Sequence, residues 1–160
     1  MPSQQKPEFE RIDFKTAVPA AYRAMLALET YVHHSGLEPS LLELVKIRAS
    51  QINGCAFCLD MHSKDARAAG ETEQRLYLLS AWREAPFYSP RERAALAWTE
   101  AVTQISETHA LDDVYELARQ HFSETELVNL TMAIVAINGW NRLEIGFRGI
   151  PGSYQPSQKR

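Results

Sequence analysis

The chain has 160 residues, of which 45% are hydrophobic and 23% charged, with a formal net charge of −3 at neutral pH. This length and composition predict one globular domain with a sizeable hydrophobic core. The slight negative charge, without a basic block or stripe, argues against nucleic acid or an anionic membrane as the main partner. No apolar run reaches the ~18 residues of a membrane span, and the first residues lack a signal-peptide core, so we expect a cytoplasmic protein.

Apolar residues recur along the chain with helical periodicity, and no segment has the alternation of a β-strand. We therefore predict an all-α, single-domain helical bundle of about seven helices. The bundle is expected over residues 13–148, between a flexible N-terminal arm at 1–12 and an irregular C-terminal tail at 149–160. The expected helices cover about residues 16–34, 39–52, 55–69, 72–82, 90–105, 112–122 and 127–144.

Local signals set several of these helix limits. The dipeptide Asn53-Gly54 is a poor helix interior and predicts a break between two helices. Ser89 with Glu92, and Ser123 with Glu126, have the spacing of capping boxes at helix starts.

Both cysteines lie in one short segment, Cys55-Ala-Phe-Cys58, and His62 follows four residues after the second. On a helix these three positions are related as i, i+3 and i+7, so their side chains share a face. The break at Asn53-Gly54 places both cysteines in the first turn of the next helix. The helix dipole and the unbonded N–H groups of a first turn favour a thiolate over a thiol. The motif therefore predicts a reactive dithiol.

Such a pair is a two-electron redox unit. One sulfur attacks an oxidant and becomes a sulfenic acid, and the other condenses with it to form a disulfide and release water. His62 lies at i+4 from Cys58 and can accept its proton, which favours Cys58 as the attacking sulfur. The helix end and an expected exposure favour Cys55 instead. On balance we predict that Cys58 attacks and Cys55 resolves.

Glu43 is a candidate third part of the site, twelve residues before Cys55. A turn at Asn53-Gly54 can bring it back toward the helix that carries the cysteines. Its neighbours Leu42 and Leu44 are apolar, which predicts a partly buried carboxylate with a raised pKa, suited to a proton relay. The alternative is a solvated glutamate that only favours the dipole of its own helix.

A metal site is the main alternative to redox chemistry. Cys55, Cys58 and His62 could supply three zinc ligands, but a structural site usually needs a fourth, and the sequence has no second C-x-x-C and no H-x-x-x-H. Asp60 and Lys64 are expected on the solvated face. We therefore predict neither a metal nor a cofactor. Two small buried hydrophobic residues are the remaining interpretation of the cysteines.

Two segments of the chain echo each other. Glu43-Leu-Val leads to Ile52-Asn-Gly, and Glu126-Leu-Val leads to Ile137-Asn-Gly, with spacings that differ by two residues. The echo is either chance or a worn duplication of a helix pair. The second segment has no cysteine, so we expect the chemistry in the first.

With Glu43, Cys55, Cys58 and His62 in the arrangement E-x11-C-x-x-C-x-x-x-H, the sequence resembles the alkyl hydroperoxidase D (AhpD)-like family, within the carboxymuconolactone decarboxylase-like superfamily. The resemblance implies that Glu43 and His62 form a proton relay and that the two cysteines are redox active.

The resemblance extends over about residues 20–145 and includes the segment Ala136-Ile-Asn-Gly-Trp-Asn-Arg142, which looks like a recurring segment of one-domain members. Phe57 departs from the pattern, because some peroxidases of the family carry a second histidine at this place. This departure puts the efficiency and the substrate in question, but not the dithiol.

The resemblance also implies an activity and an assembly. The activity is that of a cysteine-based peroxidase in antioxidant defence, which reduces alkyl hydroperoxides or hydrogen peroxide with electrons from a dithiol partner such as a lipoylated protein. The assembly is a homo-oligomer, a trimer or hexamer, with the dithiol in a pocket near a subunit contact. The superfamily's decarboxylases lack the cysteine pair, so decarboxylation is not expected.

Two other functions stay open at this point. The same dithiol could serve a thiol–disulfide oxidoreductase or redox sensor with little peroxide turnover. The chain could also be a non-enzymatic metal-binding or oligomeric interaction module.

Overall fold

The computed structural model describes residues 9–157, and within this range the protein is all-α, as predicted. The described residues form nine α-helices, one 3-10 helix and no β-strand, so the bundle has slightly more helices than the approximately seven expected. The helices are α1 (Phe14–Ala17), α2 (Pro19–His33), α3 (Pro39–Asn53), α4 (Ala56–Ala68), α5 (Glu73–Tyr77), η1 (Leu79–Ala81), α6 (Pro90–Thr103), α7 (Ile105–Thr108), α8 (Asp112–His121) and α9 (Glu124–Phe147).

The predicted arm and tail are described only in part, because residues 1–8 and 158–160 lie outside the described range. Near the start of that range, the Arg11 backbone N–H donates to the Phe147 carbonyl at 3.1 Å. Residues 149–157 contain no helix or strand. The first described residues therefore lie against the end of α9.

The helix expected over residues 16–34 is instead two helices that meet at Val18. This residue has φ −137° and ψ 78°, outside the helical region. The ring of a following proline excludes the helical conformation, and Pro19 then begins α2 at its first position. Both predicted capping boxes are present, at Ser89 in front of α6 and at Ser123 in front of α9.

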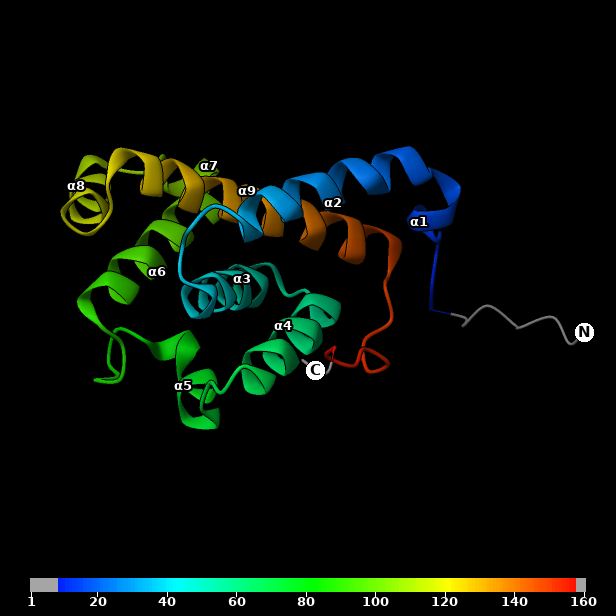
Figure 1. The fold of residues 1–160 in the computed structure, drawn as a ribbon, viewed down its shortest axis with the longest axis horizontal. Helices are drawn as coiled ribbons and strands as arrows, with labels where there is room; N and C mark the ends of the chain where they lie inside the picture. The colour runs from blue at the N-terminus through cyan, green and yellow to red at the C-terminus, as the bar shows by residue number, and fades with distance from the viewer. Residues whose placement is uncertain (1–8, 158–160) are drawn as a thin grey trace, which may run out of the picture.

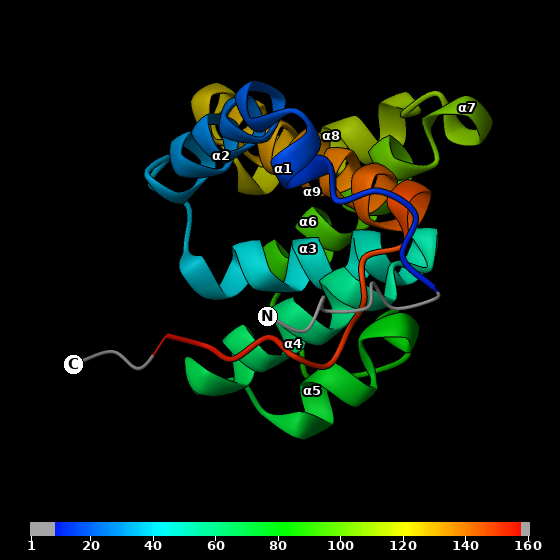
Figure 2. The ribbon, with the colours of Figure 1, turned by 90° about the vertical axis from the view of Figure 1, so that its right-hand side faces the viewer.

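Helix α3 lies in the middle of the molecule and contacts α4, α6 and α9. Helices α2 and α9 run beside each other along one side of it, and α4 and α5 lie on the other side (Figures 1 and 2). The largest hydrophobic cluster fills the space between α3 and α9 and includes Val45, Leu130 and Ile134, which are fully buried. None of the described helices combines the length and the apolar character that a membrane span requires.

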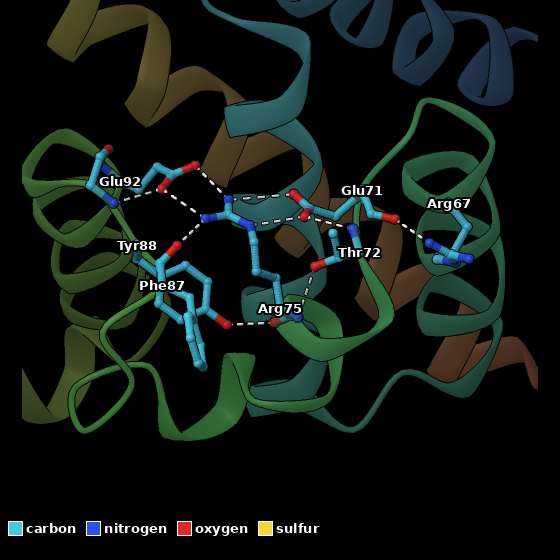
Figure 3. Close-up of polar contacts among 8 residues, drawn as sticks. Arg67, Glu71, Thr72, Arg75, Phe87, Tyr88 and Glu92 are labelled. Atoms are coloured by element: carbon cyan, nitrogen blue, oxygen red, sulfur yellow. Dashed lines mark hydrogen bonds and ion pairs between the residues drawn. The ribbon is translucent and has the colours of Figure 1, made fainter.

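The connection between α4 and α6 is held by a polar network around Arg75 of α5 (Figure 3). The Arg75 guanidinium donates to Glu71 at 2.8 Å and to Glu92 at 2.6 Å. It also donates to the Phe87 carbonyl. Thr72 caps α5 by accepting the Arg75 backbone N–H at 3.2 Å. This network fixes the α5 segment, whose Arg75 forms part of the cavity described below.

Candidate active site

A single glycine sets the position of the first cysteine. Gly54 ends α3 with φ +71° and ψ 36°, a left-handed conformation that glycine adopts without strain. Cys55 follows as the N-cap of α4, one position earlier than predicted, and its Sγ accepts the Cys58 backbone N–H at 3.4 Å. The predicted break at Asn53-Gly54 therefore places the two sulfurs together at the N-terminal end of a helix.

Both cysteines are buried, with Cys55 only 1% exposed and Cys58 3% exposed. They form a small buried cluster with Ala49 of α3 and Ile137 of α9, and Phe57 and Trp140 pack against this cluster. The expected exposure of Cys55 is therefore wrong. A helix distant in sequence covers the N-terminal end of α4, which local sequence signals could not indicate.

The two thiols are not equivalent. Cys58 donates a hydrogen bond to Cys55, which lowers the pKa of Cys55 against the effect of its burial. The same hydrogen bond, together with burial, raises the pKa of Cys58 far above that of an ordinary thiol. When the pair loses one proton, the charge therefore resides on Cys55, and Cys58 keeps its proton.

His62 and Glu43 form a hydrogen-bonded pair between α4 and α3. The His62 Nδ1 and the Glu43 Oε2 are 3.0 Å apart, and the two side chains are 11% and 20% exposed. Glu43 is thus a partly buried carboxylate facing α4, and not a solvated one. His62 lies one turn after Cys58 on the same helix, so the pair stands beside the second cysteine.

Asp65 joins this pair, which the sequence did not indicate. Among residues 9–157, Glu43, His62 and Asp65 are the group of three metal-ligating side chains whose ligand atoms lie within 4.8 Å of one another. The predicted alternative zinc set of Cys55, Cys58 and His62 does not form such a group. A cation at this site would therefore meet one imidazole and two carboxylates rather than thiolates.

These groups open onto a cavity of about 1250 Å³ between α2, α3, α4, α9 and the tail. Cys58, His62 and Glu43 line this cavity, whereas Cys55 does not. Its apolar lining is mixed with charged groups. The larger apolar and aromatic lining residues include Tyr22, Leu26, Leu42, Phe57, Met61 and Trp140. A molecule in the cavity can therefore reach Cys58 directly.

Phe57, the residue between the cysteines, lies half-buried in the wall of this cavity. The Lys15 Nζ lies 5.1 Å from the centroid of its ring, within the range of a cation–π contact. Phe57 therefore supplies an apolar ring that contacts the Lys15 ammonium, and its own side chain carries no titratable group.

The tail crosses α4 near the relay. The Gly152 backbone N–H donates to Asp60 at 3.0 Å, and Lys64 donates to the Tyr154 carbonyl at the same distance. The Tyr154 hydroxyl donates to Asp65 at 2.7 Å. Asp60 and Lys64 therefore remain partly exposed to solvent, and the tail covers part of both side chains.

The sequence of the chain matches a known protein family. Residues 19–101 match the Carboxymuconolactone decarboxylase family. The chain belongs to this family. Within the family it is AhpD-like, as the motif predicted, and it carries the C-x-x-C pair at Cys55 and Cys58.

Two relatives resemble this family member over most of its length. Uncharacterized protein YdfG of Bacillus subtilis (strain 168) is 45% identical over 136 residues, which are 85% of this chain and 92% of YdfG. The crystal structure of a protein of unknown function from Agrobacterium tumefaciens, described as a candidate antioxidant defence protein AhpD, is 52% identical. It superposes with a TM-score of 0.88 over 91% of this chain and 99% of that one.

The AhpD-like fold is also found in a more distant protein. The crystal structure of the debrominase Bmp8 matches with a TM-score of 0.78 and 19% identity, over 86% of this chain and 74% of that one. At this identity the likeness concerns the fold alone. The same helical scaffold therefore occurs in a debrominase, so the fold by itself does not identify the reaction, which depends on the site residues.

Asn141 and Glu144 are the residues of this site that sequence reasoning missed. Both lie on α9 and are buried, at 0% and 5% exposure. The polar Asn141 side chain lowers the pKa of both cysteines, and the Glu144 charge raises both. A signal was available, because a carboxylate and an amide in the most apolar helix of the chain needed buried partners.

Proposed function

We propose that this protein is a dithiol peroxidase that reduces alkyl hydroperoxides or hydrogen peroxide in antioxidant defence. The observation that carries the proposal is the arrangement around the cavity. Cys58 lines it, the Cys55 Sγ accepts the Cys58 backbone N–H at 3.4 Å, and His62, which is bonded to Glu43, follows one helical turn after Cys58. The AhpD-like relationship supports the same chemistry.

In the proposed first step, the Cys58 thiolate attacks the outer oxygen of the hydroperoxide. The O–O bond breaks, Cys58 becomes a sulfenic acid, and the alkoxide leaves with the electron pair and takes a proton from the relay. In the second step the Cys55 thiolate attacks the Cys58 sulfur. The hydroxide of the sulfenic acid leaves, takes up from solvent the proton that Cys55 lost on ionising, and departs as water while an intrachain disulfide forms. One peroxide thus oxidises two thiols and yields one alcohol and one water.

The relay has a specific task in this scheme. Because Cys58 keeps its proton in the resting pair, a base must remove that proton before the sulfur can attack. We propose that His62, one turn after Cys58 on α4, accepts it, and that Glu43, bonded to the imidazole Nδ1, stabilises the cation that forms. The same proton is then available for the departing alkoxide.

The cycle needs a reductant, because two electrons must return to the disulfide after each turnover. We propose a dithiol partner, such as a lipoylated protein, acting in the cytoplasm. The cavity beside Cys58 supports a small, mobile dithiol more than a bulky protein disulfide, because both sulfurs lie below the surface. For the same reason, a thiol–disulfide oxidoreductase that acts on protein disulfides is a less favoured function for this site.

We further propose that the protein is a homo-oligomer, a trimer or hexamer. The support is the outer face of α9, where Val128 and Val135, two turns apart, are 61% and 48% exposed. Side chains of this kind on one face favour a protein contact. Light scattering on the purified protein distinguishes a trimer, a hexamer and a monomer by mass.

The deciding experiment counts thiols on the reduced protein before and after one equivalent of cumene hydroperoxide. The wild type should lose both thiols rapidly. Cys58→Ser should keep its remaining thiol, whereas Cys55→Ser should lose one and yield a sulfenic acid that dimedone traps. Survival of both thiols in the wild type would overturn the peroxidase proposal, and a sulfenic acid formed only in Cys58→Ser would reverse the two cysteine roles.

A second candidate function is the binding of a divalent cation. The specific observation in its favour is the Glu43–His62–Asp65 group, which offers one nitrogen and two carboxylate oxygens at an open cavity. Stoichiometric metal in the purified protein, lost in His62→Asn with both thiols still reactive, would support this second candidate. Its protein-derived donor set would be three side chains, which leaves a coordination position for a ligand.

A further inference from the structure

The segment Ala136–Arg142 of α9 is not explained by the roles proposed above, although it lies directly over the dithiol. Ile137 packs against Cys55 and Cys58. Asn141 follows one turn later on the same face of the helix and is fully buried. A fully buried amide must satisfy its donors and acceptor within the protein, so the direction of this side chain can be deduced from its neighbours.

The orientation of the Asn138 amide is fixed by partners that can only accept or only donate a hydrogen bond. The Ile134 backbone carbonyl can only accept, and the Asn138 Nδ2 donates to it at 2.9 Å. The Asn138 Oδ1 is therefore the acceptor end, and it receives the Arg142 guanidinium, which can only donate, at 3.1 Å. Asn138 is thus fixed from both sides.

Asn53, next to the turn that leads into Cys55, connects the oriented Asn138 amide to the amide of Asn141. Its Nδ2 donates to the Asn138 Oδ1 at 2.9 Å and to the Asn141 Oδ1, also at 2.9 Å. Asn53 and Asn138 are the equivalent positions of the two echoing segments. Because the oxygen of Asn141 is occupied by this bond, the nitrogen of its amide must point the other way.

One N–H of the Asn141 amide donates to the Ser50 hydroxyl at 3.0 Å. That hydroxyl donates its own proton to the Lys46 carbonyl at 2.7 Å, so it accepts from Asn141. The second N–H is not used by Ser50 or Asn53, and it lies on the face of α9 where Ile137, one turn earlier, shares a buried cluster with the two cysteines. In agreement, the Asn141 side chain lowers the pKa of both thiols by hydrogen bonding.

We propose that Asn141 is a catalytic residue of the dithiol, a fixed hydrogen-bond donor that stabilises negative charge on the sulfur pair. The amide chain from Ile134 through Asn138 and Asn53 holds it in this orientation. The donor cannot rotate to present its oxygen, because its oxygen is already bonded to Asn53. The inference rests on the dithiol chemistry proposed above, but it concerns the thiols themselves and not the oxidant.

The test measures how the rate of alkylation by iodoacetamide depends on pH, with thiolate absorbance followed in parallel. Asn141→Ala should react on the order of tenfold more slowly at neutral pH, because a hydrogen bond to a charged sulfur is lost. Asn141→Asp should react more slowly still, because a carboxylate then faces the thiolate. The matched control is Asn129→Asp on the same helix.

Asn129 suits the comparison because it is also buried, at 6% exposure, and also bridges two groups, the Tyr31 hydroxyl and the Ser35 carbonyl. Asn129→Asp should keep the wild-type pH profile. If the Asn141 variants do not fold, Asn53→Ala removes the orienting bond from a less buried position, and it should slow alkylation in the same direction. Wild-type pH profiles in the folded Asn141 variants, or in Asn53→Ala where they do not fold, would overturn the inference.

This result is independent of peroxide turnover. A shifted pH profile in a protein whose thiols survive hydroperoxide would reject the peroxidase proposal and keep the role of Asn141. Unchanged profiles in a protein that consumes hydroperoxide would do the opposite.

Discussion

At the scale of single residues, the thiol pair is tuned by two opposing groups on α9. The Asn141 amide favours thiolate, whereas the charge of Glu144 opposes it. The buried Glu144 carboxylate lowers the stability of the fold when it is charged. Burial raises its pKa, and the Lys15 ammonium at 3.7 Å offsets this effect only in part. Gly149 makes room for it, since a Cβ there would lie 1.8 Å from the Glu144 Oε2.

The substitution Glu144→Gln tests this balance through pH. A carboxyl whose folded pKa lies above its unfolded value costs no stability below the unfolded pKa, and stability is lost as pH rises through the folded pKa. The glutamine variant should therefore equal the wild type near pH ~4 and exceed it by about 1 kcal/mol at neutral pH, in urea unfolding.

The same substitution should accelerate alkylation of the thiols at neutral pH, because the charge that raises the pKa of both cysteines is gone. Its effect on the rate is thus opposite in sign to that of Asn141→Ala. Slower alkylation in Glu144→Gln would show that this carboxylate acts on the sulfurs in some way other than through its charge.

At the scale of elements, the site depends on one sharp turn between α3 and α4. The turn lets Glu43 and His62, which are 19 positions apart, form a hydrogen bond, and it places Cys55 at the cap of α4. Gly54 provides it with a positive φ, and a Cβ there would meet nothing within 4 Å. The demand for glycine is therefore one of backbone conformation and not of space.

We expect Gly54→Ala to lower the free energy of unfolding by about 1–2 kcal/mol, the cost of a left-handed conformation with a Cβ. Gly146→Ala is the matched control. Gly146 lies inside α9, has no positive φ, and its added Cβ would meet nothing within 4 Å. Alanine should stabilise the protein there by about 0.5–1 kcal/mol. Urea unfolding of both variants measures the two changes in the free energy of unfolding. Changes of the same sign in both variants would contradict the explanation.

At the scale of the whole molecule, the cavity is assembled from segments that are distant in the sequence. Helices α2, α3, α4 and α9 contribute, and residues 154–157 of the tail close one side of it. Burial and the hydrogen bond to Asp65 raise the pKa of the Tyr154 hydroxyl to about 12, so it remains a donor at neutral pH. The tail is thus held as a wall beside the relay.

Ending the chain after Pro151 should widen access to Cys58. We expect a bulky maleimide to label this thiol several-fold faster in the truncated protein, whereas the small iodoacetamide changes little, because only size was restricted. The lost tail contacts should cost about 1–2 kcal/mol, so the fold remains. Tyr154→Phe, which loses one hydrogen bond and keeps the tail, is the control. An unchanged ratio of the two labelling rates would contradict the role of the tail as a wall.

The sequence by itself determined the features that depend on local chemistry. The capping boxes at Ser89 and Ser123, the left-handed Gly54 and the spacing from Cys55 to His62 involve residues within one or two turns of each other. The helical class follows from apolar periodicity, which is also a local pattern. The proline break at Val18 was equally local, and the prediction missed it by giving apolar periodicity more importance than Pro19.

Only the tertiary structure decided the environment of the sulfurs. Ile137, Asn141 and Glu144 lie 79 to 89 positions further along the chain than the cysteines. Ile137 helps to bury Cys55, Asn141 lowers the pKa of its thiol, and the charge of Glu144 raises it. The choice of which thiol faces the cavity and the tail contact with Asp65 also depend on such distant pairs. Burial and charge depend on all neighbours in space, whereas the periodicity of a sequence specifies only neighbours along a helix.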